Sequence, residues 1–433
     1  MNKILKEIGV YILIFAFSVG LLLSLLLLSG KISRNSIRKN MESSAEKLCE
    51  REVFFRAIKG VEASIVDRYA DSIILNIAWC LDEEKPLESV IWSSYYYTSE
   101  VNENENLKEA VFHDKAANKQ YLRYWHGSVA CVKLFLLLTD IKGIYFINGV
   151  LLVVLFIALI TMLIKRKAYD LALAFFIGAV LVNSWVVPLS LEYTWVFIIM
   201  LFMSILILKT YEKENELLLC ALFLFTGIIT NYLDFLTSET LTLLVPLIII
   251  MYFRLKKNGD HLFKTELLYA IKKAVLWGVG YAGMWISKWV IASLVIGENS
   301  FKYVREHIDE RIGGDIGDRT LIGYIVGAIG KNIFKLVPAC FGNVGMIIFG
   351  IVIFALIYIC YVYKKKQVAW GKVGLYLLIG LIPYVRYAVL HEHAYLHNFF
   401  TCRAQLATVI AVILSVNEIV EWRYLENAVK RKK

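Results

Sequence analysis

The chain has 433 residues, of which 58% are hydrophobic, and its formal net charge is +10. Soluble globular proteins contain about 45–50% apolar residues, so this composition excludes an ordinary soluble domain and indicates a protein that faces lipid. The apolar residues form continuous runs rather than short alternating segments, which argues against a membrane β-barrel.

The apolar runs predict about ten membrane-spanning helices, since about 20 apolar residues cross a bilayer. The first run is longer than a signal-peptide core of about 7–15 residues, so we expect it to be a retained anchor. The run 321–341 is interrupted by Lys331 and Lys335, and this spacing better fits a helix lying in the membrane interface. The expected spans are 9–29, 144–164, 169–189, 192–208, 216–233, 238–254, 273–296, 344–363, 373–390 and 399–418.

The positive charge follows the distribution expected of a membrane protein, so it does not indicate a nucleic-acid partner. Lys and Arg gather in alternate turns and at the C-terminus, whereas the turns near Glu192 and Asp234 contain none. Because cytoplasmic loops are enriched in Lys and Arg, both termini are expected in the cytoplasm. The expected fold is one all-α integral membrane domain over 1–433. A first external loop, 30–140, carries amphipathic helices, and a second, 297–343, carries the interfacial helix.

Two acids in the first external loop, Asp67 and Asp71, would share one face of a helix because they are four residues apart. Paired carboxylates act as a general base and as a metal or sugar ligand, because each raises the pKa of the other. The alternative is a solvated face on which Arg68 neutralises the acids. Spacing alone favours that alternative.

An aromatic cluster, residues 123–127, precedes the apolar run 129–138. Aromatic residues near a membrane boundary commonly anchor the interface. Trp125 would equally stack on the apolar face of a sugar ring, and His126 would hydrogen-bond a hydroxyl or a phosphate. The sequence leaves both interpretations open.

Two further acids, Asp234 and Glu239, lie in a short polar turn between two spans. Crossing a bilayer does not require acids in a turn, so both are candidates to face a cavity. The alternative is an exposed turn in which Thr237 or Ser238 caps the next helix.

Basic residues follow in the second external loop, where Arg305 would order over a phosphate ligand through guanidinium contacts. A solvated loop of mixed charge is the alternative. Lys288 precedes this loop inside a span. A cation within a span usually faces the bundle interior or a watery cavity and marks function.

The most polar segment near a span end contains His391, His393 and His397, between Arg386 and Arg403. Arginines at membrane depth are costly against lipid, and an anionic ligand would offset that cost. We therefore predict a site for a phosphate or pyrophosphate. The spacing of His393 and His397 would also suit a metal, although the segment is not the zinc-protease pattern. Seven scattered cysteines without a C-x-x-C pair predict neither a disulfide framework nor a zinc site. A divalent cation is therefore the one cofactor left open.

The expected topology places all five clusters at one membrane face. One span followed by a long external loop with acids on juxtamembrane helices resembles the C-type membrane glycosyltransferases. The motifs also resemble uncharacterised polytopic proteins of bacterial surface-polysaccharide gene clusters. The similar residues are Asp67, Asp71, Leu75-Asn76, Tyr124-Trp125-His126-Gly127, Asp234-Phe235-Leu236-Thr237, and His393, His397, Phe400 and Arg403.

This resemblance implies an inverting enzyme of the bacterial cytoplasmic membrane. It would move a sugar from a polyprenyl-phosphate donor to a glycan or lipid-linked acceptor on the extracytoplasmic face. Asp67 or Asp71 would be the general base, and Arg386, Arg403 and the histidines would hold the phosphate. The chain departs from the family in having no Asp-Glu or Asp-x-Asp pair near these positions.

Two other functions are compatible with the same features. A surface-polysaccharide polymerase also uses lipid-linked sugars, but typically has its large external loop later in the chain. A flippase or transporter of lipid-linked glycans would need ionisable residues along a path across the bilayer. The crowding of polar residues at one face favours transfer.

Overall fold

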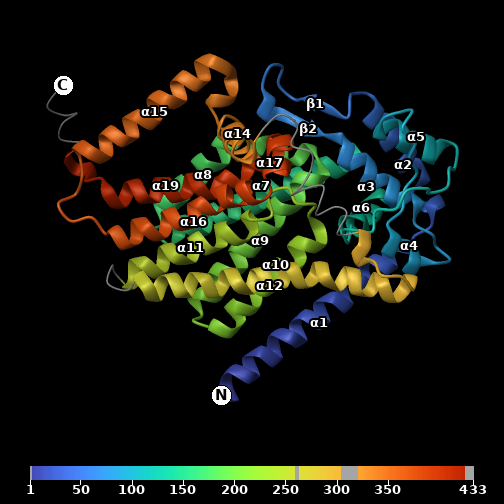
Figure 1. Cartoon of the computed structure of the whole chain (residues 1–433), viewed down its shortest axis with the longest axis horizontal. Helices are drawn as coiled ribbons and strands as arrows, with labels where there is room; N and C mark the ends of the chain where they lie inside the picture. Colours follow the sequence, from blue (N-terminus) through green and yellow to red (C-terminus); the bar gives the residue numbers. More distant parts are fainter. Residues whose placement is uncertain (1, 259–262, 304–319, 425–433) are drawn as a thin grey trace.

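The computed structural model describes residues 2–258, 263–303 and 320–424 (Figure 1). Most of these residues are helical, and eight helical segments among them are long and apolar enough to cross a membrane. This agrees with the expected multi-pass helical fold. The segments are α1 (Asn2–Gly30), α7 (Ile141–Lys165), α9 (Leu191–Glu212), α10 (Glu216–Leu233), α12 (Phe263–Ile296), α15 (Gly342–Val362) with the turn before it, α16 (Trp370–Val389), and Asn398–Ile419, which ends in α19 (Leu406–Ile419).

The expected count of about ten spans is not confirmed, because one apolar run is divided and another ends in a basic turn. The run 169–189 is divided into α8 (Tyr169–Leu181) and the 3-10 helix η2 (Ser184–Leu189). At about 1.5 Å per residue, α8 covers roughly 20 Å of the roughly 30 Å hydrocarbon core. The run 238–254 begins late as α11 (Leu241–Asn258), and the last turn of α11 is basic.

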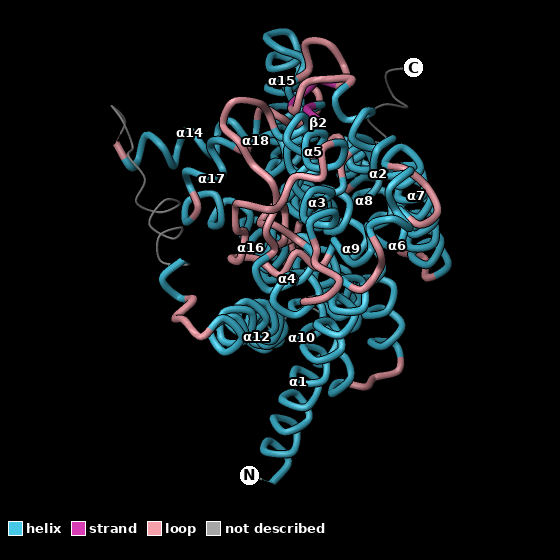
Figure 2. The backbone as a smooth tube through the Cα atoms, turned by 90° about the vertical axis from the view of Figure 1, so that its right-hand side faces the viewer, coloured by secondary structure: helices cyan, strands magenta, loops and turns pink. Residues whose placement is uncertain are grey.

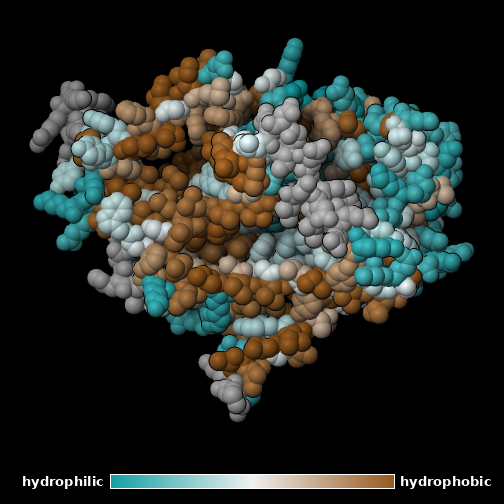
Figure 3. All heavy atoms as spheres, in the orientation of Figure 1, coloured by the Kyte–Doolittle hydropathy of each residue, from teal (hydrophilic) through white to brown (hydrophobic). Residues whose placement is uncertain are grey.

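Residues 30–140 form a folded domain at one end of the molecule, on the right in Figure 1 and facing the viewer in Figure 2. Figure 3 shows hydrophilic residues over this domain and hydrophobic residues over the neighbouring helices. The elements of the domain are α2 (Arg34–Cys49), β1 (Phe54–Arg56), η1 (Glu62–Ser64), β2 (Ile65–Asp67), α3 (Arg68–Cys80), α4 (Pro86–Trp92), α5 (Glu103–Phe112) and α6 (Ser128–Leu136).

The domain also contains a small two-stranded antiparallel sheet within an otherwise helical fold, which agrees with the all-α expectation. β1 pairs with β2 so that Phe54 lies opposite Asp67. Gly60, with φ of 80°, lies between the strands in a backbone region that favours glycine. The hairpin leads directly into α3, because β2 ends at Asp67 and α3 begins at Arg68.

Short helices of the C-terminal third lie against the hairpin (Figure 1). They are α14 (Leu321–Ile333), η3 (Ala339–Phe341), α17 (His391–Leu396) and α18 (Asn398–Thr401). The 3-10 helix η4 (Cys402–Gln405) follows α18. α14 is too short to span a bilayer, as the interrupted apolar run predicts. It buries Asn332 against the protein and exposes Ile322 and Val326.

The helix bundle packs around α9, which is largely buried, whereas α15 is almost entirely exposed. α10 and α12 approach closely at two glycines. A Cβ added at Gly227 would lie 2.0 Å from the Trp277 carbonyl oxygen, and one at Gly280 would lie 2.1 Å from the Leu224 oxygen. Small residues of this kind permit close contact between membrane helices.

At the end of the molecule opposite the domain, ion pairs form between residues of neighbouring turns. Arg166, after α7, pairs with Glu212 at the end of α9. Lys257 of α11 lies 3.1 Å from Glu214, which is in the turn between α9 and α10. The turns that carry the Lys and Arg bias are therefore neighbours in space.

Candidate functional site

A cavity of about 260 Å³ lies where the 30–140 domain meets the helix bundle. We call it the first cavity. Four sequence-predicted site residues line it: Asp67, His126, His393 and His397. They come from three distant parts of the chain, so the predicted convergence is real for these four.

Asp67 is held at the junction of β2 and α3, where it is the N-cap of α3. Its Oδ1 accepts a hydrogen bond of 2.9 Å from the Ala70 backbone N–H. Its carboxyl group also hydrogen-bonds the carboxyl group of Glu192. Burial raises the pKa of Asp67 to about 6.

The hydrogen bond between Asp67 and Glu192 requires one proton between the two carboxyl groups. The backbone N–H donor and the N-terminus of α3 both favour the negative charge on Asp67. We therefore assign the proton to Glu192. The Glu192 Oε2 is buried and has no hydrogen-bond partner among the described residues.

Glu192 also lines the first cavity and was not among the predicted site residues. It lies in the first turn of α9, at the start of an apolar run. In the sequence, the feature that could have identified Glu192 is an acid in a turn without Lys or Arg. Its partnership with Asp67 depends on tertiary structure.

Asp71 is positioned differently and does not line the cavity. Its Oδ1 accepts from the Leu191 N–H at 2.9 Å and from Ser190 Oγ at 3.1 Å, and its Oδ2 accepts from Tyr145 Oη at 2.5 Å. Burial raises the pKa of Asp71 to about 7. Asp71 thus caps α9 and positions the neighbouring Glu192.

The solvated-face alternative for these two acids is wrong. Asp67 is 4% exposed and Asp71 is 0% exposed. Arg68 does not neutralise them, because its Nη1 donates to the carbonyl oxygens of Lys47 and Leu48, at 2.9 Å each.

His126 contributes a neutral imidazole to the cavity wall. Its Nε2 lies 2.9 Å from the Tyr121 carbonyl oxygen, which can only accept, so Nε2 carries the hydrogen. Burial lowers the pKa of His126 to about 3. Nδ1 is then a buried acceptor, and it has no partner among the described residues.

Trp125 and Lys288 lie outside the cavity lining and make structural contacts. Trp125 Nε1 donates to the Met284 carbonyl oxygen at 2.7 Å. Lys288 Nζ donates to the carbonyl oxygens of Ile91 and Val90, at 2.8 and 3.2 Å, near the end of α4. Together they join α12 to the 30–140 domain.

Aromatic rings form much of the cavity wall. The Arg123 guanidinium lies 4.4 Å from the centre of the Tyr121 ring, and the Tyr121 ring lies 4.6 Å from the His126 ring. Tyr69 stacks on Phe54 with a centroid distance of 5.8 Å. The aromatic residues of the lining are Phe54, Tyr69, Tyr121, Tyr124, Phe235 and Phe400.

Two of the three clustered histidines face this cavity. The His393 and His397 rings are 4.8 Å apart, and His397 stacks on Phe400 at 5.2 Å. His391 instead packs against Tyr324 of α14, 6.2 Å between ring centres, and is not part of the lining.

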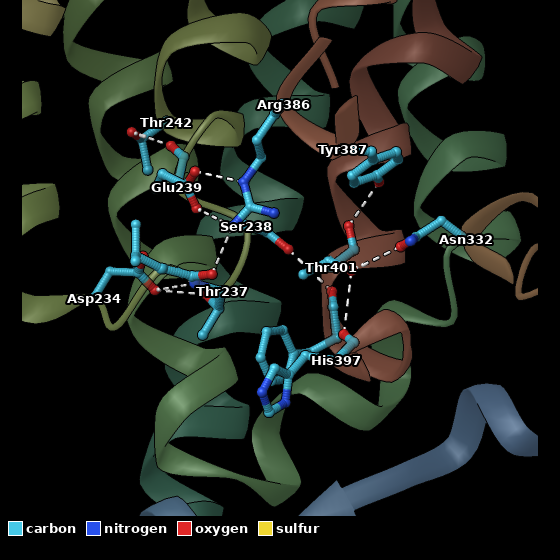
Figure 4. A network of polar contacts seen from close by, with 12 residues as sticks. Asp234, Thr237, Ser238, Glu239, Thr242, Asn332, Arg386, Tyr387, His397 and Thr401 are labelled. Carbon is cyan, nitrogen blue, oxygen red and sulfur yellow. Dashed lines mark hydrogen bonds and ion pairs between the residues drawn. The ribbon is translucent and has the colours of Figure 1, made fainter. Parts of the chain in front are cut away.

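A second group of predicted residues forms a network that we call the brace (Figure 4). Arg386 donates to Glu239 through Nε at 2.5 Å and Nη2 at 3.0 Å, and to the Leu236 carbonyl oxygen at 2.6 Å. Asp234 accepts from the Thr237 hydroxyl at 2.5 Å, and burial raises the pKa of Asp234 to about 7. The first cavity is therefore not lined by Asp234, Glu239 or Arg386, which are buried in the brace.

The brace fixes the segment that carries the cavity histidines. Ser238 Oγ donates to the Phe400 carbonyl oxygen at 3.0 Å. Tyr387 Oη donates to the Thr401 carbonyl oxygen at 2.8 Å, and Thr401 Oγ1 donates to Asn332 Oδ1 at 2.7 Å. The turn between α10 and α11, together with α14 and α16, thus holds residues 400–401 in place.

Arg403 is buried beside the cavity but does not line it. Its Nη1 donates to the Phe399 carbonyl oxygen at 2.9 Å, and its Cζ lies 4.4 Å from the Tyr193 ring centre. Its Nε and Nη2 have no hydrogen-bond partner among the described residues. Arg305 lies outside the described residues.

Across the described ranges, no group of three or more His, Cys, Asp or Glu residues is arranged to hold a metal ion. Comparison of the chain with protein-family models, curated proteins and solved structures found no match in any of the three. The geometry of the first cavity is therefore the main guide to function.

Proposed function

We propose that the protein is an inverting glycosyltransferase of the bacterial cytoplasmic membrane. It would move a sugar from a polyprenyl-phosphate donor to an acceptor hydroxyl at the first cavity. The observation that carries the proposal is the buried Asp67–Glu192 carboxyl pair in a cavity with aromatic walls. Aromatic faces suit the apolar faces of sugar rings, and a carboxylate with a raised pKa suits a general base.

In the proposed reaction, Asp67 removes the proton of the acceptor hydroxyl. The hydroxyl oxygen forms a bond to the anomeric carbon as the bond from that carbon to the phosphate oxygen breaks. The bonding electron pair leaves with the phosphate, and the proton stays on Asp67.

We propose that the first cavity lies on the extracytoplasmic side. The turns rich in Lys and Arg lie at the opposite end of the molecule, and such turns are normally cytoplasmic. Both termini would then be cytoplasmic. This orientation brings a glycan or lipid-linked acceptor to the cavity from outside the cell.

The decisive comparison is Asp67→Asn with Asp71→Asn, in purified full-length protein and with a labelled polyprenyl-phosphate sugar. Asp67→Asn should reduce transfer at least about 100-fold without lowering the unfolding temperature, because it removes the base. Asp71→Asn replaces the Oδ2 atom that accepts from Tyr145 with an NH2 group, and loss of this buried hydrogen bond should cost about 1 kcal/mol. This variant should therefore have a lower unfolding temperature and retain measurable transfer.

Wild-type transfer by Asp67→Asn would overturn the proposal. Product analysis in proteoliposomes separates the alternatives. Transfer gives one new glycosidic bond, a polymerase gives a ladder of products, and a flippase moves the label across the bilayer without a new bond.

A further inference from the structure

A second cavity, of about 550 Å³, lies beside the first. Its lining includes Glu62 of the hairpin, Lys331 and Lys335 at the end of α14, and Phe399. The Phe399 ring lies 5.7 Å from the ring of Phe54, which lines the first cavity. The two cavities therefore adjoin across a pair of aromatic rings.

The second cavity has more positive than negative charge among these residues. Glu62 already accepts two hydrogen bonds from Arg56, one of them 2.6 Å from Nε. Lys335 Nζ is 3.8 Å from the other Glu62 oxygen, and its side chain is 13% exposed. Lys331 Nζ lies 3.4 Å from the Tyr395 ring centre. The Glu62 carboxylate thus pairs with two cations, Arg56 and Lys335, and Lys331 adds a third positive charge.

Burial lowers the pKa of Lys335. The ammonium group has lost contacts with water that its neighbours in the protein do not fully replace. A charged group in that situation is stabilised by an anionic ligand more than an exposed lysine would be.

Apolar surface adjoins this cationic cavity. Gly342, the first residue of α15, lines it. The following α15 residues Val344 and Ile347 are 70% and 64% exposed. On α14, Ile322 and Val326 are exposed, while Asn332 Nδ2 donates to the Ala394 carbonyl oxygen at 2.9 Å. A ligand with a charged head and a hydrocarbon tail would match this surface.

The geometry points to a binding site for a lipid phosphate, with Lys331 and Lys335 as its cationic contacts and α15 beside its tail. That such a lipid binds here is independent of the proposed reaction. That the lipid is the sugar donor rests on the proposed function. In that case the phosphate would sit in the second cavity and the sugar would reach past Phe54 and Phe399 into the first.

This assignment also replaces one expectation from the sequence. Arg386 was expected to hold the phosphate, but its guanidinium is paired with Glu239 inside the brace. Lys331 and Lys335 were noted only as interruptions of an apolar run. Their contacts with the hairpin and α17 place them at a cavity.

The test is equilibrium binding of labelled farnesyl phosphate to purified full-length protein, without any acceptor. The double substitution Lys331→Gln and Lys335→Gln should weaken binding at least tenfold. The matched control, Lys364→Gln and Lys366→Gln, removes two exposed cations from the turn between α15 and α16 and should leave binding unchanged. Glu62→Gln should strengthen binding several-fold, because it removes the competing carboxylate.

Wild-type affinity in the Lys331/Lys335 variant would overturn the assignment, as would equal binding of farnesol. Competition by inorganic phosphate at the same concentration as farnesyl phosphate would show a site for free phosphate and would also overturn it. Asp67→Asn should bind farnesyl phosphate normally. Lipid binding without transfer by the wild type would therefore reject the proposed function and leave the lipid site standing.

Discussion

The first cavity and the brace lie at the same end of the molecule and contain the same kinds of residue. They differ in how their charges are paired. In the brace, Arg386 meets Glu239, so opposite charges satisfy each other. In the cavity, Asp67 meets Glu192, so two acids share a proton.

This difference separates two roles for buried charge. A buried ion pair with both partners present is part of the fold, and its loss is costly because it leaves one charge alone. Two acids held together repel each other when both are ionised, so the pair is stable only when one acid is protonated or a ligand supplies positive charge. The predictions below test that division.

The largest effect on stability is expected when the brace loses one partner. Arg386→Gln leaves Glu239 without its cation and should cost about 3–5 kcal/mol, enough to deplete folded protein in the membrane. The double variant Arg386→Gln with Glu239→Gln should recover much of that loss. Thermal unfolding of detergent-solubilised protein measures both. If Arg386→Gln unfolds at the wild-type temperature and loses only activity, Arg386 binds substrate and does not stabilise the fold.

A second prediction concerns the pH dependence of transfer. A general base must be ionised, so activity is present above the pKa of Asp67 and is lost as pH falls through it. The expected midpoint is about pH 6, because burial raises the pKa of Asp67.

Substitutions of Glu192 sharpen the same test. Glu192→Gln keeps a donor to Asp67 and should move the midpoint little. Glu192→Ala removes the donor, destabilises the ionised form of Asp67, and should move the midpoint to higher pH. Rate profiles of all three proteins decide this, and an unmoved midpoint in Glu192→Ala would refute the pairing.

The smallest expected effect comes from the aromatic wall. Tyr69→Leu removes a ring that lines the first cavity and should raise KM for the sugar substrate about five- to tenfold, as expected for the loss of about 1 kcal/mol of stacking. Tyr169→Leu, at the exposed start of α8, is the matched control. Equal KM values for the two variants would exclude Tyr69 from sugar contact.

The sequence was sufficient to predict the multi-pass helical fold, because long apolar runs act locally. It was not sufficient for the count of spans. The run 169–189 reads as one span, yet the backbone of Asn183 has φ of 55° and η2 follows with Pro188 inside it. A kink of this kind depends on packing against neighbouring helices.

For the site, local spacing identified Asp67, His126, His393 and His397 but could not assign their partners. Asp67 and Asp71 look equivalent at four residues apart. The structure distinguishes them, because Asp71 accepts a hydrogen bond from the N-terminus of α9, while Asp67 pairs with Glu192. These contacts join residues more than a hundred positions apart, and a single sequence carries no record of them.

One consequence follows from the position of Glu192 in the first turn of α9. The 22 residues of this helix rise roughly 33 Å, close to the roughly 30 Å hydrocarbon thickness of a bilayer. At its opposite end, Glu212 pairs with Arg166. In the proposed orientation, the length of α9 would place the carboxyl pair at the depth of the lipid head groups. A sugar attached to a lipid phosphate would emerge at that depth and would not have to leave the bilayer to react.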